Sequence, residues 1–210
     1  MADRAFLKKV DDACEAALVE IGFKRPRRGT IYLEIKSDFL GWVGLNVGNH
    51  GDLVRINPNI GIHCKPAEKL WRDLVADRSC PYKKGYLATY ALPLGTQTPQ
   101  DIDAIVFFTG ASTDREARRL SMLIGEYGTP WMIEHASYGA LIPLVEERFA
   151  DLPNYPQRLA AMYYLAGQTE KAVKFTHDVL DSLRKRDDGM VINQFERFAV
   201  PFLQMIDPEV

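Results

Sequence analysis

The stretch from Thr30 to Cys64, TIYLEIKSDFLGWVGLNVGNHGDLVRINPNIGIHC, decides the fold of this chain. Apolar and other residues alternate within it in three successive runs, at about residues 31–36, 42–47 and 54–64. Side chains of a β-strand point to opposite faces with a period of two, so each run predicts a strand with one apolar face. Turn-forming residues around Asp38 and at 48–52 separate the runs. We therefore predict an antiparallel meander whose dry face is covered by helices.

The opposite, wetter face of this predicted sheet is the first candidate for function. It combines aromatic side chains with arginine and hydrogen-bonding groups, and protein interfaces favour Trp, Tyr and Arg as anchors. The alternative is that another segment of the same chain, such as the acidic helices of the second half, covers it. The residues predicted to lie on this face are Tyr32, Trp42, Asn46, Arg55, Asn57, Asn59 and His63.

Further patterns complete an α+β fold. A helix is predicted from about Arg4 to Ile21, with Asp3 as its N-cap and Gly22 as its stop. A short helix beginning at Pro66 should follow the three strands. Two more strands are predicted at about 86–92 and 102–108, the second one covered on both faces because it is apolar without alternation. The sheet would then be a meander of about five strands packed on helices.

From residue 110 the pattern changes to helices. Thr113 and Glu116 form a capping box, and Gly128 should close the helix that they open. Pro143 should kink or end the next helix, and Pro201 should interrupt a final helix at 191–206.

This change predicts a sheet domain at 1–110 and a helical region at 111–210 packed on it, either as a separate unit or as part of one continuous domain.

One helix pair near the C-terminus follows the tetratricopeptide pattern at Leu159, Ala160, Tyr163, Gly167 and Ala172. No second copy is found, and solenoids need several stacked units, so a single helical hairpin with Gly167 at its turn is predicted.

Charge is distributed unevenly along the 210 residues, although the formal net charge is only -2. Residues 1–100 hold 15 Lys and Arg against 11 Asp and Glu, whereas residues 101–210 hold 11 against 17. The small net charge argues against general nucleic-acid binding. An acidic helical surface could dock a basic partner, or it could only keep the protein solvated. Its predicted members are Glu146, Glu147 and Asp151 near a helix end, with Asp178, Asp181, Asp187 and Asp188 further along the chain.

The sequence contains no catalytic or metal-ligand motif, so no cofactor and no metal are predicted. His63 and Cys64 are adjacent on a predicted strand, where neighbouring side chains point to opposite faces and cannot form a dyad. The cysteines Cys14, Cys64 and Cys80 form no close pair, which is typical of a reducing compartment. With no apolar signal core and no run of membrane-spanning length, a cytoplasmic location is predicted.

The order of elements over residues 5–110 carries a family resemblance. A helix ends in Gly22-Phe23-Lys24-Arg25, a basic loop with Gly29 follows, and then come Ile31-Tyr32-Leu33, Trp42-Val43-Gly44-Leu45-Asn46 and Ile56-x-Pro58-x-Ile60-Gly61-Ile62. This order resembles a group of uncharacterised bacterial α/β domains found near polymorphic toxin genes, some of which are taken to be immunity proteins. The helical second half departs from the smaller members of the group.

The resemblance implies a non-enzymatic cytoplasmic protein that binds one cognate toxin and occludes its active site. It offers no catalytic residues. Two alternatives stay open. One is an enzyme that uses His63, Arg55 and Asn57 as a polar pocket on the sheet. The other is an adaptor that holds a peptide in a groove containing Tyr163 and Tyr164.

Overall fold

The computed structural model describes residues 3–27, 30–75, 87–99, 102, 104–148, 155–186 and 189–207. The chain splits into two compact units, Met1–His63 with Tyr82–Ala136, and Cys64–Pro81 with Ser137–Val210. The first unit contains two antiparallel sheets and the second is helical, so the α+β prediction is confirmed. The change from strands to helices falls near residue 110, but the division into domains 1–110 and 111–210 stays a prediction.

Helix α1 (Arg4–Glu20) opens the first unit. Its N-cap is Asp3, as predicted, and the Asp3 side chain accepts a hydrogen bond from the Ala5 amide at 3.3 Å. The helix buries Val10, Cys14 and Leu18 and packs against α3 (Thr113–Leu123). Gly22 ends it with φ +97°, a conformation that glycine adopts without steric cost.

The larger sheet has five strands in the order β1-β2-β3-β6-β7. Strands β1 and β2, β2 and β3, and β6 and β7 pair antiparallel. The five strands are β1 (Lys24–Arg27), β2 (Thr30–Glu34), β3 (Phe39–Gly44), β6 (Asn59–Cys64) and β7 (Tyr90–Pro93).

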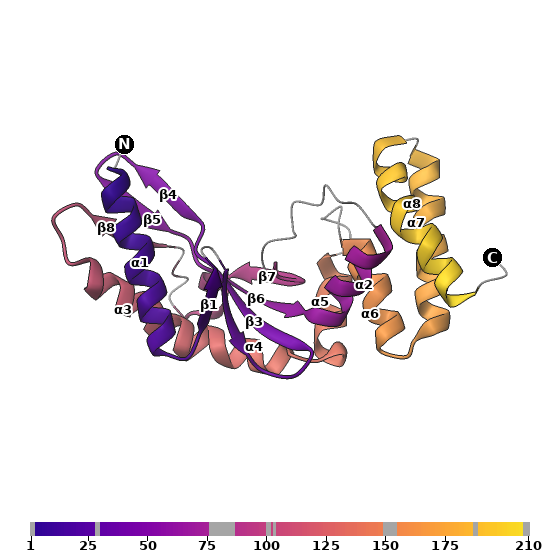
Figure 1. Ribbon diagram of the computed structural model, residues 1–210, viewed down its shortest axis with the longest axis horizontal. Helices are drawn as coiled ribbons and strands as arrows, with labels where there is room; N and C mark the ends of the chain where they lie inside the picture. The colour runs from indigo at the N-terminus through magenta and orange to yellow at the C-terminus, as the bar shows by residue number, and fades with distance from the viewer. Residues whose placement is uncertain are drawn as a thin grey trace. The chain divides into compact units, whose positions relative to one another are not determined.

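A smaller sheet has the order β4-β5-β8, with both pairings antiparallel. Its strands are β4 (Val47–His50), β5 (Leu53–Ile56) and β8 (Ile105–Phe108). Figure 1 shows these strands beside α1, away from β7. One face of β8 is buried through Ile105 and Phe107, whereas Phe108 is 53% exposed. The prediction that this strand is covered on both faces is therefore wrong.

The two sheets share one bent hairpin, which the sequence did not predict. The run at 54–64 was expected to be a single strand, but it is divided into β5 and β6 at Asn57 and Pro58. Pro58 has no amide hydrogen to donate to a ladder. Opposite the bend, Asn46 has φ +45°, and its carbonyl accepts from the Asn57 amide at 3.3 Å. The chain therefore changes sheet at this point.

Helices cover the dry face of the five-stranded sheet, as predicted. After α3 the chain continues through a π-helical turn (η3, Ile124–Gly128) into α4 (Thr129–His135). A Cβ at Gly41 would lie 2.6 Å from Met132 Sδ, so α4 lies directly on β3. Tyr90 stacks on Trp131 of α4 with ring centroids 6.2 Å apart. The residues buried beneath include Ile31, Val43, Ile60 and Ile62.

Three details of these helices differ from the predictions. Ser112, and not Thr113, caps α3 by accepting from the Arg115 amide at 3.3 Å. Gly128 has a helical φ of -73° and does not end the helical segment, because the π-helical turn leads directly into α4. The helix beginning at Thr129 ends at His135, well before Pro143.

The second unit consists of helices α2 (Lys65–Val75), α5 (Tyr138–Arg148), α6 (Tyr155–Leu165), α7 (Thr169–Arg186) and α8 (Gly189–Ile206). Gly167 turns the chain between α6 and α7 with φ +77°, as predicted. Pro143 and Pro201 both lie inside helices, α5 and α8, so Pro201 does not interrupt the final helix. None of the helices in the described part of the chain has the length and apolar character to cross a membrane.

Candidate functional site

The residues predicted on one polar face are divided between the two sheets. Tyr32, Trp42, Asn59 and His63 belong to the five-stranded sheet, whereas Arg55 belongs to β5 of the three-stranded sheet. Asn46 and Asn57 lie at the bend of the hairpin. The expected single continuous face is therefore two separate surfaces, one on each sheet.

Tyr32 and Trp42 are cross-strand partners in the five-stranded sheet, and Lys24 pairs with Tyr32 on its other side. Paired residues of antiparallel strands share a face, so these three side chains form a row. A Cβ at Gly44 would lie 2.2 Å from the Trp42 ring, which shows that the indole lies along its own strand. Lys24 donates to Glu34 at 2.6 Å, and this hydrogen bond raises the pKa of Lys24. Tyr32 and Trp42 are half-buried, whereas Lys24 is exposed and paired with Glu34 of the same sheet.

His63 is an internal residue. Its side chain is 5% exposed, and its Nδ1 donates to the Leu87 carbonyl at 2.5 Å. Along β6 it stands four residues beyond Asn59 at the bend, roughly 13 Å at the usual strand rise. The structure therefore does not bring His63 to Arg55 and Asn57, which removes the geometric basis for the predicted enzyme pocket.

Arg55 lies on an exposed face of the three-stranded sheet. Its cross-strand neighbours are Gly48 on β4 and Val106 on β8, and its Nε donates to Asn57 Oδ1 at 3.1 Å. The next pairing places Leu53 opposite both His50 and Phe108 on the same face. We call this surface the open face: Gly48, His50, Leu53, Arg55, Val106 and Phe108.

Sequence reasoning found Arg55 but missed Phe108. Val106 and Phe108 are apolar and point to the open face, while Ile105 and Phe107 are apolar and point inward. The run therefore shows no alternation, which is the usual signal for a strand covered on both sides.

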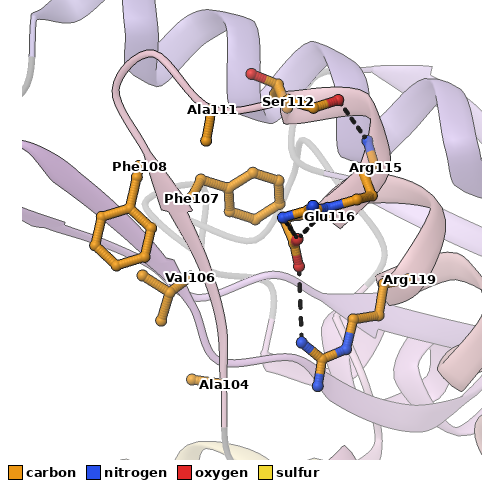
Figure 2. Close-up of a pocket in the computed structure, with 10 residues that line it drawn as sticks. Ala104, Val106, Phe107, Phe108, Ala111, Ser112, Arg115, Glu116 and Arg119 are labelled. Carbon is orange, nitrogen blue, oxygen red and sulfur yellow. Dashed lines mark hydrogen bonds and ion pairs between the residues drawn. The ribbon is translucent and has the colours of Figure 1, made fainter.

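A cavity of about 250 Å³ lies between β8 and the start of α3. Figure 2 shows Val106 and Phe108 on one side of the strand, with Phe107 and the side chains of α3 on the other. Glu116 accepts from Arg115 Nε at 2.9 Å, and Arg119 Nη1 lies 3.7 Å from its second oxygen. No sequence motif marked this cavity, because strand and helix residues meet there only after folding.

Three carboxylates of the predicted acidic surface form hydrogen bonds or ion pairs within the helical unit: Glu146, Asp178 and Asp181. The Glu146 carboxylate accepts from the Tyr163 hydroxyl and from Lys171 Nζ, the latter at 2.7 Å. These two hydrogen bonds, the one from Lys171 first, lower the pKa of Glu146. Burial is the main reason why the pKa of Tyr163 is raised. Glu146 therefore joins α5 to α6 and α7.

Among the described residues of this predicted surface, Glu147, Asp178 and Asp181 are exposed, as is Glu146 itself. Asp178 pairs with Lys174 at 2.6 Å, and Asp181 lies 3.9 Å from Arg184, both on α7. Helix α7 carries five Lys and Arg against three Asp and Glu, so the acidic balance of the second half is not concentrated there. Glu147 is exposed near the end of α5. Asp151, Asp187 and Asp188 lie outside the described residues.

Within the described ranges, no group of three or more His, Cys, Asp and Glu side chains is placed to hold a metal ion. Cys14 and Cys64 are buried thiols, and burial raises the pKa of Cys14 to about 12. Cys80 lies outside the described residues.

The tyrosines of the predicted peptide groove are packing residues. Tyr163 is 3% exposed and meets Phe175 edge to face, with centroids 5.5 Å apart. Tyr164 meets Phe202 in the same geometry at 6.0 Å. A hollow between α7 and α8 is lined instead by residues such as Val173, His177 and Leu203.

Comparison of this chain with protein-family models, with curated proteins and with solved structures gives no match.

Proposed function

We propose that this protein is a cytoplasmic immunity or inhibitor protein that binds one cognate bacterial toxin and blocks its active site by contact. The proposal draws its class from the resemblance of residues 5–110 to toxin-associated α/β domains. It draws its mechanism from one observation, the open face of the three-stranded sheet. No turnover is required of any residue in this mechanism.

The open face has the composition of a docking surface. Phe108 is half-exposed, and the open face also carries the exposed Arg55. Arginine and aromatic residues, phenylalanine among them, are enriched in protein interfaces relative to the rest of the surface. A half-exposed phenylalanine on an open sheet face is unfavourable in water, and burying it supplies free energy to association.

The proposal is tested by growth. The chain is co-expressed with the product of the neighbouring gene, which the proposal expects to be the toxin, and growth is compared with that of cells expressing this product alone. We expect protection by the natural chain and its loss in the double variant Arg55→Ala, Phe108→Ala. The matched control is Asp178→Lys, Asp181→Lys on α7, which should protect.

Failure of the natural chain to protect, or conversion of a small molecule by the purified chain, would exclude the proposed function. Loss of protection in the α7 variant alone would keep the function but assign docking to that helix.

A further inference from the structure

Strand β8 is a free sheet edge, since no strand pairs with its outer side among the described residues. The Thr109 amide donates to the Asp52 carbonyl at 3.1 Å, which makes these two a hydrogen-bonded pair. Hydrogen-bonded and non-hydrogen-bonded pairs alternate in an antiparallel ladder. The main-chain groups of Val106 and Phe108 therefore point away from β5, toward the free edge. The Phe108 carbonyl accepts a hydrogen bond from the Ala111 amide at 3.1 Å. The Val106 N–H and C=O and the Phe108 N–H remain directed outward.

No charged side chain or proline protects this edge against pairing, although the strand has only four residues. Natural sheets blunt their edges with lysine, proline, bulges or inward-pointing charges. The sequence of β8 is Ile-Val-Phe-Phe, which contains neither a charge nor a proline. Such a strand is a ready template for another extended chain.

The cavity of about 250 Å³ borders this edge, because Val106 and Phe108 belong to its lining. Charged side chains of α3 complete the lining. Arg115 and Arg119 have side chains 76% and 57% exposed, whereas that of Glu116 is 15% exposed. The less exposed Glu116 carboxylate thus pairs with the guanidinium groups of both arginines. The three side chains together carry a net charge of +1. Each guanidinium has five donors, and Glu116 cannot satisfy all of them. Figure 2 shows the Arg115 and Arg119 side chains directed to the Glu116 carboxylate. Their remaining donors suit a second carboxylate, supplied by a partner.

Thr113, at the start of α3, is a buried polar residue of the same lining. It lines the cavity, is 5% exposed, and its Oγ1 is buried without a hydrogen-bond partner in the described part of the chain. An unsatisfied buried hydroxyl is costly, and each such group in a folded protein calls for an explanation.

We propose that β8 takes up an extended segment of the partner protein as a fourth strand, with an acidic side chain of that segment held by Arg115 and Arg119. The proposal rests on the proposed function, because it specifies how the toxin is gripped. Main-chain hydrogen bonds to Val106 and Phe108 would provide affinity, and the cavity beside the strand would provide specificity.

Two other occupants fit less well. A cavity of about 250 Å³ is below the roughly 300–1,000 Å³ of a typical small-molecule site. Pairing of two copies through β8 would bring the same arginines of both chains to one seam, and like charges oppose association.

The test uses the full chain and a library of short random linear peptides displayed on phage. We expect the selected peptides to alternate β-forming residues and to share one acidic position, and replacing that residue by its amide should weaken binding about tenfold, as the loss of a charge-assisted hydrogen bond does. Val106→Pro removes an outward amide and should abolish binding, whereas Val106→Ala keeps the amide and should retain it. Proline is tolerated on edge strands, and circular dichroism checks that the variant folds.

Charge is tested separately, so that the proposal does not depend on the proline variant. Arg119→Glu should weaken binding of the acidic peptide, while Arg118→Glu, on the same helix but outside the cavity lining, should not.

Equal effects of these two variants, the absence of any selected peptide, or binding insensitive to Val106→Pro would overturn the proposal. Dimers that Val106→Pro converts to monomers would also overturn it, in favour of a second copy. Protection from the toxin that survives both Val106→Pro and Arg119→Glu would refute edge pairing while leaving the proposed function intact.

Discussion

Both halves of the bent hairpin alternate apolar residues with polar or aromatic ones. The polar and aromatic side chains of the two halves have different surroundings. In the half formed by β3 and β6, the polar and aromatic side chains are directed to the chain itself: His63 donates to a carbonyl and Trp42 lies over its own strand. In the half formed by β4 and β5, Arg55 and His50 are exposed on the open face. The alternation predicts which residues share a face. It does not predict what covers that face.

Burial on both faces distinguishes β6, in the five-stranded sheet, from β5, in the three-stranded sheet. Strand β6 is buried from Ile60 to Cys64 on both faces, whereas β5 alternates between buried Val54 and Ile56 and more exposed neighbours. We therefore expect the five-stranded sheet to contribute more to stability and the three-stranded sheet more to binding.

The largest expected effect compares two truncations of large apolar side chains. Ile62→Ala removes a fully buried side chain of β6 and should lower the free energy of unfolding by about 3 kcal/mol, since it leaves a cavity. Phe108→Ala, on the open face, should cost less than about 1 kcal/mol. Urea unfolding of both variants measures the difference. Equal losses would mean that the open face is covered in the native protein.

An intermediate effect is expected at the bend between the two halves. Asn46 has φ +45°, which Asn tolerates but a β-branched residue does not. Asn46→Val should lower stability by about 1–2 kcal/mol, whereas Asn46→Gly should be neutral or slightly stabilising. Thermal unfolding followed by circular dichroism checks both. A valine variant as stable as the natural chain would show that the hairpin does not depend on this conformation.

The smallest expected effect is in the helical unit, where the hydrogen-bonded carboxylate of Glu146 contributes to stability. The hydrogen bonds from Lys171 and Tyr163 lower the pKa of Glu146 below its ordinary 4.5, so its ionised form stabilises the fold. That contribution is fully present above the ordinary pKa and is lost as the pH falls through the lowered one. Because the side chain is partly exposed, Glu146→Gln should cost only about 0.5 kcal/mol at neutral pH. Urea unfolding should show no difference between the two chains at a pH below the lowered pKa; a difference that persists there would contradict this account.

Much of the fold could be predicted from local patterns. The alternation in residues 30–64 predicts strands, Asp3 and Gly22 bound the first helix, and Gly167 turns the helical hairpin. Each of these depends on the chemistry of a few neighbouring residues, which is why a single sequence carries the information.

The candidate site could be predicted only in part. Arg55 was predicted to lie on the wetter face because residues 54–64 alternate, and it is exposed on β5. Phe108 was missed because apolar residues occupy both faces of β8, and the cavity was missed because Val106 and Arg119 are brought together only by the packing of α3 on β8. Glu146 was expected at the surface for docking, but an ion pair across α5 and α7 engages it.

The sequence by itself determined that this chain forms antiparallel strands followed by helices, because periodicity and capping act over a few residues. Only the tertiary structure decided that one hairpin serves two sheets, which faces are buried and which strand edge is free. Those features follow from contacts between residues far apart in the chain, and no local pattern contains them.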